Sequence, residues 1–460
     1  MGEGGAIRRI RIGAGAGMLG DRLDPALEMV ARGDIHYLAF DNLGEVTISD
    51  LQRRRLQEPD KGYADIRRTL NAVMKPCSER GIRLITNAGG VNAREAARRA
   101  VELASRQGLQ GLKVAAVLGD DTVGQETRQR LAELKGKGVP LRSLDTGEDF
   151  SIPEDRVVGM SVYMGAFPIV EALQRGAQVI ITGRYADAAL WLAPQVYEFG
   201  WKETEWDRLA LGTVVGHLLE CTGLVCGGSF TDWRDIPGLD RLGYPIAEAW
   251  GEHEAIITKV PGSGGIINTA TVKLQLLYEI GDPTAYITPD VVADFTSVKV
   301  EEVGTDRVRI SAVKGKPRTG SLKAVIGYLN GYMAEGCVAY GPPAAEEKAR
   351  ETVRMLERRF PMLGISPLEL NTDFIGLNSL VGPLTPPTAR PAEVMMRMAL
   401  RVATEAEANR FLQEFYPLYV AGPPAACGIM LQPARQVVSL WPTLIPREEG
   451  RWGVEVMESP

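Results

Sequence analysis

Short apolar runs rich in β-branched residues alternate with helical stretches through the first part of the chain. The runs occupy residues 7–12, 37–40, 82–85, 114–118, 157–162, 179–181 and 255–260. Runs of this length predict buried strands, and the helices between them predict right-handed crossovers in a parallel sheet. Because the spacings are irregular, we expect an open sheet; a closed barrel is the alternative. We therefore predict an α/β domain over residues 1–290, with an open, mostly parallel sheet and helices on both faces.

The pattern changes after residue 290. The antiparallel strands that we expect here are 298–303, 307–313, 324–329 and 393–402. Residues 346–360 and 404–415 predict helices, and Thr404 with Glu407 forms a capping-box pattern at the start of the second. Strand–helix–strand repeated twice predicts a smaller α+β domain of the ferredoxin-like kind over residues 291–460.

The composition excludes several classes of protein. With 460 residues the chain is too long for one ordinary core, and 45% hydrophobic with 24% charged residues is typical of globular proteins. A net charge of −6 leaves no basic surface for nucleic acid or anionic lipid. The five cysteines are scattered, and the N-terminal residues lack an apolar signal region. We expect a cytoplasmic protein with reduced thiols and neither nucleic acid nor membrane as partner.

A glycine-rich segment follows the first predicted strand. Gly15, Gly17 and Gly20 match the spacing of the dinucleotide-binding fingerprint. Asp41 also lies near the position, about 20 residues further on, where an acid binds the ribose. This spacing favours a loop at the carboxyl end of a strand, where parallel sheets bind their ligands.

The acids after these glycines argue against a dinucleotide. Asp24 is the expected N-cap of the next helix, with Pro25 in its first position and Asp21 close by. Two carboxylates beside a helix N-terminus repel a pyrophosphate. We therefore expect the loop to line another substrate; a nicotinamide site and a purely structural turn are the alternatives.

Further substrate-binding candidates lie after other predicted strands. They are Gly89, Gly90, Tyr163, Gly262, Ser263, Gly264 and Gly265. Residues 261–265 precede a helix, so their N–H groups and the serine hydroxyl favour a second anion site. This loop lacks the Gly-Lys-Ser/Thr ending of a phosphate-binding loop, which argues against hydrolysis of nucleoside triphosphates.

Polar side chains at strand ends are the candidate catalytic residues. They are Asp41, Asn87, Asp120, Arg184 and Asp187, joined by His217 and Glu220 on a predicted helix. Carboxylates and an amide that converge on one crevice supply proton transfer and carbonyl polarisation. Arg184 is suited to clamp a carboxylate or phosphate, and a plain salt bridge with Asp187 is the alternative.

His217 and Glu220 stand three residues apart, so they share one helix face. That spacing serves an acid–base pair or metal ligation; a polar helix end with a satisfied histidine is the alternative. The chain has no HExxH motif or cysteine cluster to complete a zinc site. We therefore expect no metal, and these motifs imply no cofactor.

Several stretches resemble the acyclic terpene utilisation family, AtuA. They include GAGAGMLGDRLDPALEM, YLAFDNLGE, ITNAGGVN, GRYADAAL, GHLLECTGLVCGG, PGSGGIINTATVKLQLLYEIGDPTAYITPDVVADF and YVAGPPAACG, from about residue 10 to the C-terminal region. The resemblance implies a role in the catabolism of branched acids as coenzyme A thioesters, beside acyl-CoA carboxylases, hydratases and dehydrogenases. Many relatives carry a further small C-terminal domain, which leaves open a separate small-domain subunit as a partner. The family more often has Glu where this chain has Asp41.

Three hypotheses follow. The first is an enzyme that adds or removes water on an acyl-CoA or branched carboxylate, with Arg184 binding an anionic group, Asp187 and Glu220 exchanging protons and Asn87 polarising a carbonyl. The second is an NAD(P)-dependent oxidoreductase that uses the loop from Gly15 to Gly20. The third is a non-catalytic subunit that binds acyl-CoA. We expect a homo-oligomer in each case.

Overall fold

The computed structural model describes residues 9–64, 66–119, 121–384, 386 and 391–460. The chain forms two compact units. The larger contains the residues up to Gly327 together with Leu440–Pro460, and the smaller is Tyr328–Ser439. The predicted boundary at residue 290 is therefore displaced. Strands after that residue pair with the large sheet, and the end of the chain returns to the larger unit.

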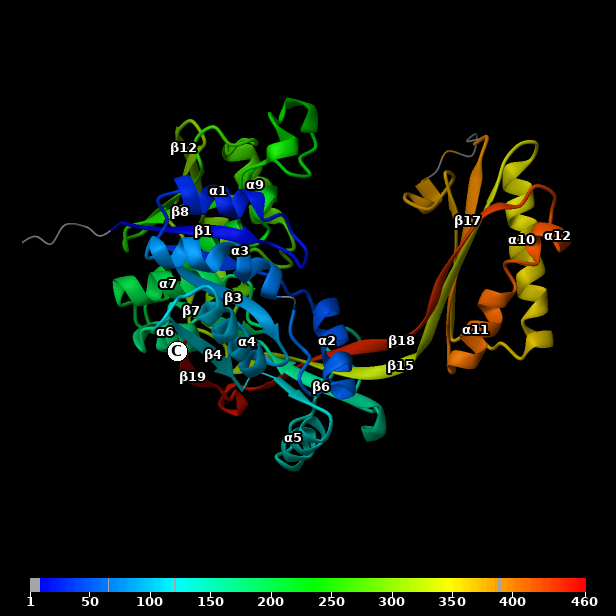
Figure 1. Ribbon diagram of the computed structural model, residues 1–460, viewed down its shortest axis with the longest axis horizontal. Coiled ribbons are helices and arrows are strands. Elements are labelled where there is room, and N and C mark those ends of the chain that lie inside the picture. Colours follow the sequence, from blue (N-terminus) through cyan, green and yellow to red (C-terminus); the bar gives the residue numbers. More distant parts are fainter. Residues whose placement is uncertain (1–8, 65, 120, 385, 387–390) are drawn as a thin grey trace, which may run out of the picture. The chain divides into compact units, whose positions relative to one another are not determined.

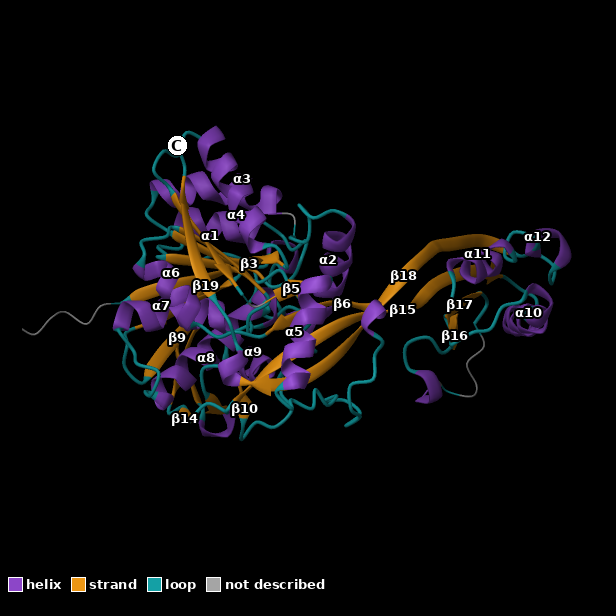
Figure 2. Cartoon of the chain, turned by 90° about the horizontal axis from the view of Figure 1, so that it is seen from below, coloured by secondary structure: helices purple, strands orange, loops and turns teal. Residues whose placement is uncertain are grey.

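Five parallel strands form the centre of the large sheet (Figure 1). In sheet order they are β1 (Ile10–Ala16), β2 (Tyr37–Phe40), β3 (Arg83–Gly90), β7 (Val179–Gly183) and β4 (Lys113–Leu118). Helices α1 (Asp24–Arg32), α3 (Ile66–Glu79) and α4 (Ala93–Arg106) pack along one face, and α6 (Phe167–Gln174), α7 (Ala189–Phe199) and α8 (Trp206–Glu220) along the other (Figure 2). Apolar side chains such as Met29, Leu38 and Leu70 fill the first of these layers.

Antiparallel strands extend this sheet on both sides. Beyond β1 they are β8 (Pro245–Ala249), β9 (Glu254–Lys259), β13 (Arg307–Ser311) and β12 (Lys299–Gly304), and beyond β4 lies β19 (Gly453–Glu458). Among the described strands of this sheet, four neighbouring pairs are parallel and five antiparallel. The expectation of a mostly parallel sheet is therefore wrong. Short turns join β8 to β9 and β12 to β13, and such connections cannot cross over to a parallel neighbour.

Other elements of the larger unit form two further layers. Strand β6 (Val157–Val162) has the predicted bounds, but it pairs with β5 (Asp121–Val123) and β15 (Ser321–Tyr340) in a second sheet. Helices α2 (Glu45–Gln57) and α5 (Gln125–Gly136) pack on β6. A third small sheet of β10 (Tyr286–Ile287), β11 (Val292–Asp294) and β14 (Lys314–Lys316) packs on α8, beside α9 (Thr269–Leu277).

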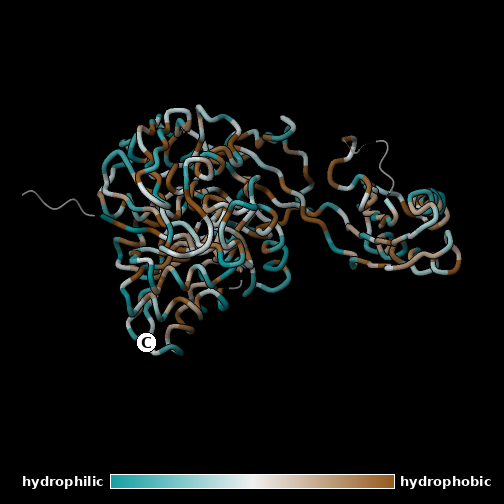
Figure 3. Tube along the Cα trace, turned by 90° about the horizontal axis from the view of Figure 1, so that it is seen from above, coloured by the Kyte–Doolittle hydropathy of each residue, from teal (hydrophilic) through white to brown (hydrophobic). Residues whose placement is uncertain are grey.

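The smaller unit places its helices on one antiparallel sheet. After β15 come α10 (Ala345–Arg359), β16 (Glu369–Ile375), β17 (Val394–Val402), α11 (Glu405–Gln413), α12 (Leu418–Ala421) and β18 (Cys427–Pro446). The strand order is β16-β17-β15, with β18 paired to β15. Burial alternates along β17, as its sequence predicts, and α10 consists largely of hydrophilic residues (Figure 3). Thr404 and Glu407 form the predicted capping box.

Candidate active site

A cavity of about 910 Å³ opens in the larger unit near the carboxyl ends of β1 and β2. Five of the predicted site residues line it, namely Gly17, Asp41, Arg184, Asp187 and Glu220. Asn87, Tyr163 and His217 lie directly behind them, in contact with Asp41, Arg184 and Glu220 respectively. The remaining predicted glycines and Ser263 do not line this cavity, and Asp120 lies outside the described residues. The expected convergence of polar strand ends therefore holds for these central positions only.

Asp41 follows β2 and is buried at the cavity wall. Its Oδ1 atom accepts hydrogen bonds from Asn87 Nδ2 at 2.6 Å and from the Leu43 N–H at 3.2 Å. Asn87 in turn accepts a bond from the Asn42 N–H at 2.7 Å. Burial and the nearby Asp187 carboxylate raise the pKa of Asp41 to about 7, against the opposing effects of Arg184 and Asn87. Asn87 thus holds Asp41 in place and does not itself face the cavity.

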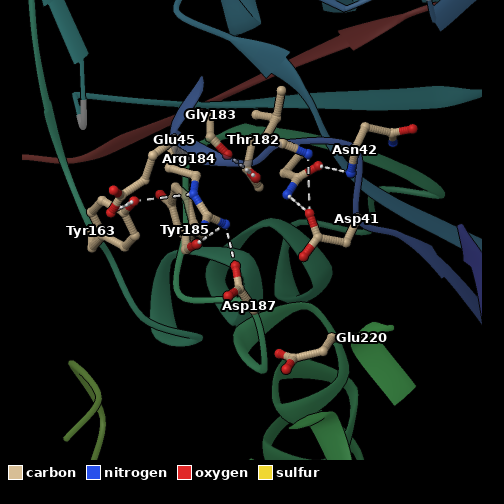
Figure 4. A network of polar contacts seen from close by, with 12 residues as sticks. Asp41, Asn42, Glu45, Tyr163, Thr182, Gly183, Arg184, Tyr185, Asp187 and Glu220 are labelled. Carbon is tan, nitrogen blue, oxygen red and sulfur yellow. Dashed lines mark hydrogen bonds and ion pairs between the residues drawn. The ribbon is translucent and has the colours of Figure 1, made fainter. Parts of the chain in front are cut away.

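Arg184 and Asp187 follow β7 and form an ion pair (Figure 4). The guanidinium of Arg184 lies 4.9 Å from the centre of the Tyr163 ring and donates through Nε to the Tyr163 hydroxyl at 3.3 Å. Burial opposes its charge, but Asp187 and its other neighbours raise the pKa of Arg184 well above its ordinary value. Tyr163 donates onward to Glu45 at 2.8 Å. Arg184 is therefore a permanent buried cation. Its contacts with the Tyr163 ring and hydroxyl and with the Asp187 carboxylate hold it in one orientation.

His217 and Glu220 pair at the C-terminal end of α8, where Nδ1 and Oε1 are 2.8 Å apart. Both side chains are buried. Burial raises the pKa of Glu220. Burial would lower the pKa of His217, but the charge of Glu220 raises it overall. The predicted acid–base spacing thus produces a contact whose carboxylate lines the cavity.

The carboxyl groups of Asp41, Asp187 and Glu220 face a common space, the first two from loops after β2 and β7 and the third from the end of α8 (Figure 4). The charge of Asp187 contributes to the raised pKa of both Asp41 and Glu220. Neighbouring carboxyl groups that differ in burial hold their protons to different pH values, and this lets one act as an acid while another acts as a base. The arrangement is therefore suited to proton transfer.

The glycine-rich segment lines the cavity with residues 17–19, 21 and 22, but its glycines also serve close packing. Gly15 lies inside β1, where a Cβ atom would come within 2.4 Å of the Phe40 ring. A Cβ on Gly17 would lie 2.6 Å from the Glu220 carbonyl oxygen, so this glycine lets β1 approach the end of α8. The Gly17 N–H donates to Asp21 at 2.9 Å. The chain's own carboxylate thus occupies the donor that a pyrophosphate would need.

The start of α1 also differs from the prediction. The N-cap is Leu23, without a capping side chain, and Asp24 lies in the first turn. Asp21 instead binds the Tyr244 hydroxyl and the Thr222 hydroxyl, the latter at 3.3 Å. Thr222 and Tyr244 line the cavity, and sequence reasoning missed them because they lack a motif and lie about 200 residues from the loop that they support.

The second predicted anion site, residues 261–265, packs closely against the backbone of neighbouring loop residues. A Cβ on Gly264 would lie 2.1 Å from the Gly238 carbonyl oxygen, and one on Gly265 would lie 2.4 Å from that of Cys226. The following helix, α9, is capped by Asn268, which accepts from the N–H groups of its second and third residues. Glu302 accepts from the N–H of Thr269. This helix end is therefore satisfied within the protein, and the expectation of an anion site here is wrong.

A cysteine nucleophile, a metal site and a membrane-spanning helix find little support in the described part of the chain. Burial raises the pKa of the cavity thiol Cys221 to about 12, so it is a poor nucleophile. No group of three or more His, Cys, Asp or Glu side chains among the described residues has an arrangement that could hold a metal ion. Within the same residues, none of the helices combines the length and the apolar character needed to cross a membrane.

Fold and cavity together define an α/β protein with a cluster of buried carboxyl groups beside a parallel sheet. A comparison with protein-family models matches residues 10–456 to the acyclic terpene utilisation family protein AtuA. The match covers nearly the whole chain, so the protein belongs to this family. The comparisons with curated proteins and with solved structures found no match.

Proposed function

We propose that the protein is an acid–base enzyme that adds water to, or removes water from, a branched acyl compound. The observation that carries this proposal is the carboxyl group of Asp41, which is buried at the cavity wall with a pKa of about 7. A general acid or base works best when its pKa lies near the working pH. Below pH 7 Asp41 is mostly protonated and can give its proton to a leaving hydroxyl group.

The charges around the cavity favour an uncharged acyl carbonyl over a free carboxylate. The acidic residues that line the cavity are Asp21, Asp41, Asp187, Glu220 and Glu279. The basic residues in this lining are Arg22 and Arg184. Because Arg184 is already paired with Asp187, a substrate carboxylate would meet net repulsion. A thioester carbonyl carries no charge and avoids this cost. This refines the hypothesis that Arg184 clamps an anion: its charge instead stabilises the developing oxyanion of the acyl group.

The other walls of the cavity suit a hydrocarbon chain. Met18, Leu19, Leu43, Leu224, Leu239 and Leu242 line it. Burial of such surface against an acyl chain contributes about 25 cal/mol for each Å² removed from water. A branched apolar acyl group also agrees with the family's description, acyclic terpene utilisation.

Exchange of hydrogen with solvent tests the proposal without knowledge of the reaction direction. The purified protein is incubated in D₂O with branched and straight acyl thioesters, saturated, unsaturated and hydroxylated, and mass spectrometry follows deuterium uptake and gain or loss of water. We expect turnover of one of these classes, little with the corresponding free acids, and a 10²- to 10⁴-fold loss in Asp41→Asn. Full activity of Asp41→Asn, or no exchange with any thioester, would contradict the proposal.

The geometry speaks against the oxidoreductase alternative. A dinucleotide needs free N–H groups after β1, but Gly13 and Gly15 lie within that strand and Asp21 takes the Gly17 N–H. A titration with NAD(H) and NADP(H) followed by tryptophan fluorescence should therefore show no binding. The third hypothesis, a non-catalytic subunit, predicts binding of acyl thioesters without any exchange in the D₂O experiment.

A further inference from the structure

His217, a residue of α8, makes polar contacts through both nitrogen atoms of its ring, one of them with α9. Its Nε2 atom lies 2.7 Å from the Gln275 carbonyl oxygen, and Gln275 Nε2 returns a bond to the His217 carbonyl at 3.0 Å. The rings of Tyr286 and Phe295 pack on the imidazole, with centroids 5.7 and 5.3 Å away. The imidazole is thus fixed in one orientation, with its Nδ1 atom on Glu220.

These contacts determine where the protons are. A carbonyl oxygen only accepts hydrogen bonds, so Nε2 of His217 carries a hydrogen in every state. The 2.8 Å contact between Nδ1 and Glu220 Oε1 then needs one further proton, held by either atom. Without it, a lone pair would face a carboxylate oxygen in a buried site. The pair therefore keeps one proton between its members.

The second carboxyl oxygen of Glu220 has no partner in the described part of the chain. Oε2 is buried and without a hydrogen bond there, although the side chain, 6% exposed, lines the cavity. An unpaired buried carboxyl oxygen costs free energy, so its persistence at a cavity wall indicates a group that meets a ligand.

We propose that Glu220 Oε2 is the proton acceptor of the reaction and that His217 is its positioning residue, which takes up the proton at Oε1 when Oε2 gains one. This inference rests on the proposed function. In the direction of water removal, Oε2 takes the hydrogen from carbon while the Oε1 proton passes to Nδ1. The C–H electron pair forms the double bond, the C–O bond breaks, and Asp41 protonates the leaving hydroxide to water. Transfer of one proton through solvent from the pair to Asp41 restores the starting state.

Nuclear magnetic resonance of ¹⁵N-histidine-labelled protein tests the shared proton without any turnover. The chain has only three histidines, so His217 is assigned by its loss in His217→Asn. In Glu220→Gln the carboxylate charge is gone while burial remains, so the pKa of His217 should fall. An unchanged titration of His217 would overturn the proposal. The matched control is Glu126→Gln, at an exposed position on α5, which should leave the histidine signals unchanged.

Kinetics in the thioester exchange assay separate the roles of the two residues. We expect Glu220→Gln to lower kcat by 10²- to 10⁴-fold with little change in KM. His217→Asn should lower kcat less and move the acidic limb of its pH profile upward, because His217 normally lowers the pKa of Glu220. An unmoved limb contradicts the positioning role. Loss of activity in Asp41→Asn but not in Glu220→Gln would contradict this inference alone. Full activity in both variants would contradict the proposed function as well.

Discussion

The two units of the molecule treat their charged residues in opposite ways. The larger buries Asp41, Arg184, His217 and Glu220 around one cavity. The smaller packs apolar side chains such as Met396, Phe411 and Phe415 in its core. Among its described residues Arg354 forms an exposed ion pair with Glu351, and the two side chains are 55% and 38% exposed.

This difference shows in which unit burial perturbs the charged groups most. Water screens an exposed ion pair, so such a pair contributes only about 0–1 kcal/mol to stability. Burial removes that screening, which shifts pKa values and makes each charge depend on its partners. The buried charges of the larger unit therefore cost stability, whereas the exposed pair in the smaller unit has little effect on it. Substitutions in each unit test this contrast.

The largest effect is expected for Arg184→Met. It leaves Asp187 without its cation beside buried Asp41, and loss of one partner of a buried pair costs about 3–5 kcal/mol. All seven tryptophans lie in the larger unit, so urea unfolding followed by tryptophan fluorescence reports on that unit. The control Arg354→Met, in the smaller unit, should change stability by no more than about 0.5 kcal/mol in far-ultraviolet circular dichroism. Equal effects of the two substitutions would remove the contrast.

Asp41→Asn should stabilise the larger unit at high pH. The folded protein holds the Asp41 proton up to about pH 7, whereas the ordinary pKa is 3.8, so wild-type stability falls as pH rises between these values. Asparagine accepts the same bonds without a charge. At about 1.4 kcal/mol per pH unit, the gain in the free energy of unfolding reaches up to about 4 kcal/mol at pH 8 and is smaller at pH 5. A gain that does not depend on pH would contradict the assigned cause.

The smallest effect concerns the smaller unit. Thr404→Ala removes the capping side chain of α11 and should cost about 1 kcal/mol. Circular dichroism should show the loss, whereas the tryptophan transition stays in place because the smaller unit has no tryptophan. Thr404→Ser keeps the hydroxyl and is the control. A shifted tryptophan transition would mean that the two units unfold together.

Local patterns predicted the elements better than their partners. Residues 37–40 and 157–162 are strands with the expected bounds, but only the first belongs to the central sheet. Apolar periodicity reports burial along one element and carries no information about which strand lies beside it. For the same reason residues 298–303 and 307–313, predicted as antiparallel strands, were assigned to the second domain, whereas they belong to the large sheet.

Glycine was the least informative signal in the candidate site. Its spacing after the first predicted strand predicted a ligand loop. Gly17 does line the cavity, but Gly15 serves the close approach of Phe40 and Gly17 also serves that of α8. A missing side chain fits a turn, a ligand or a crowded neighbour equally well. Only the packed structure shows which neighbour is present.

The sequence by itself determined the family, the α/β class and the strand-end and helix positions of Asp41, Arg184, Asp187 and Glu220, because these depend on local pattern. The tertiary structure alone decided that the His217–Glu220 pair is buried beside the cavity, that the Gly17 N–H donates to Asp21, and that residues 261–265 pack against neighbouring backbone. Proton affinity and ligand access depend on burial and on neighbours distant in the chain, and those arise only when the chain folds.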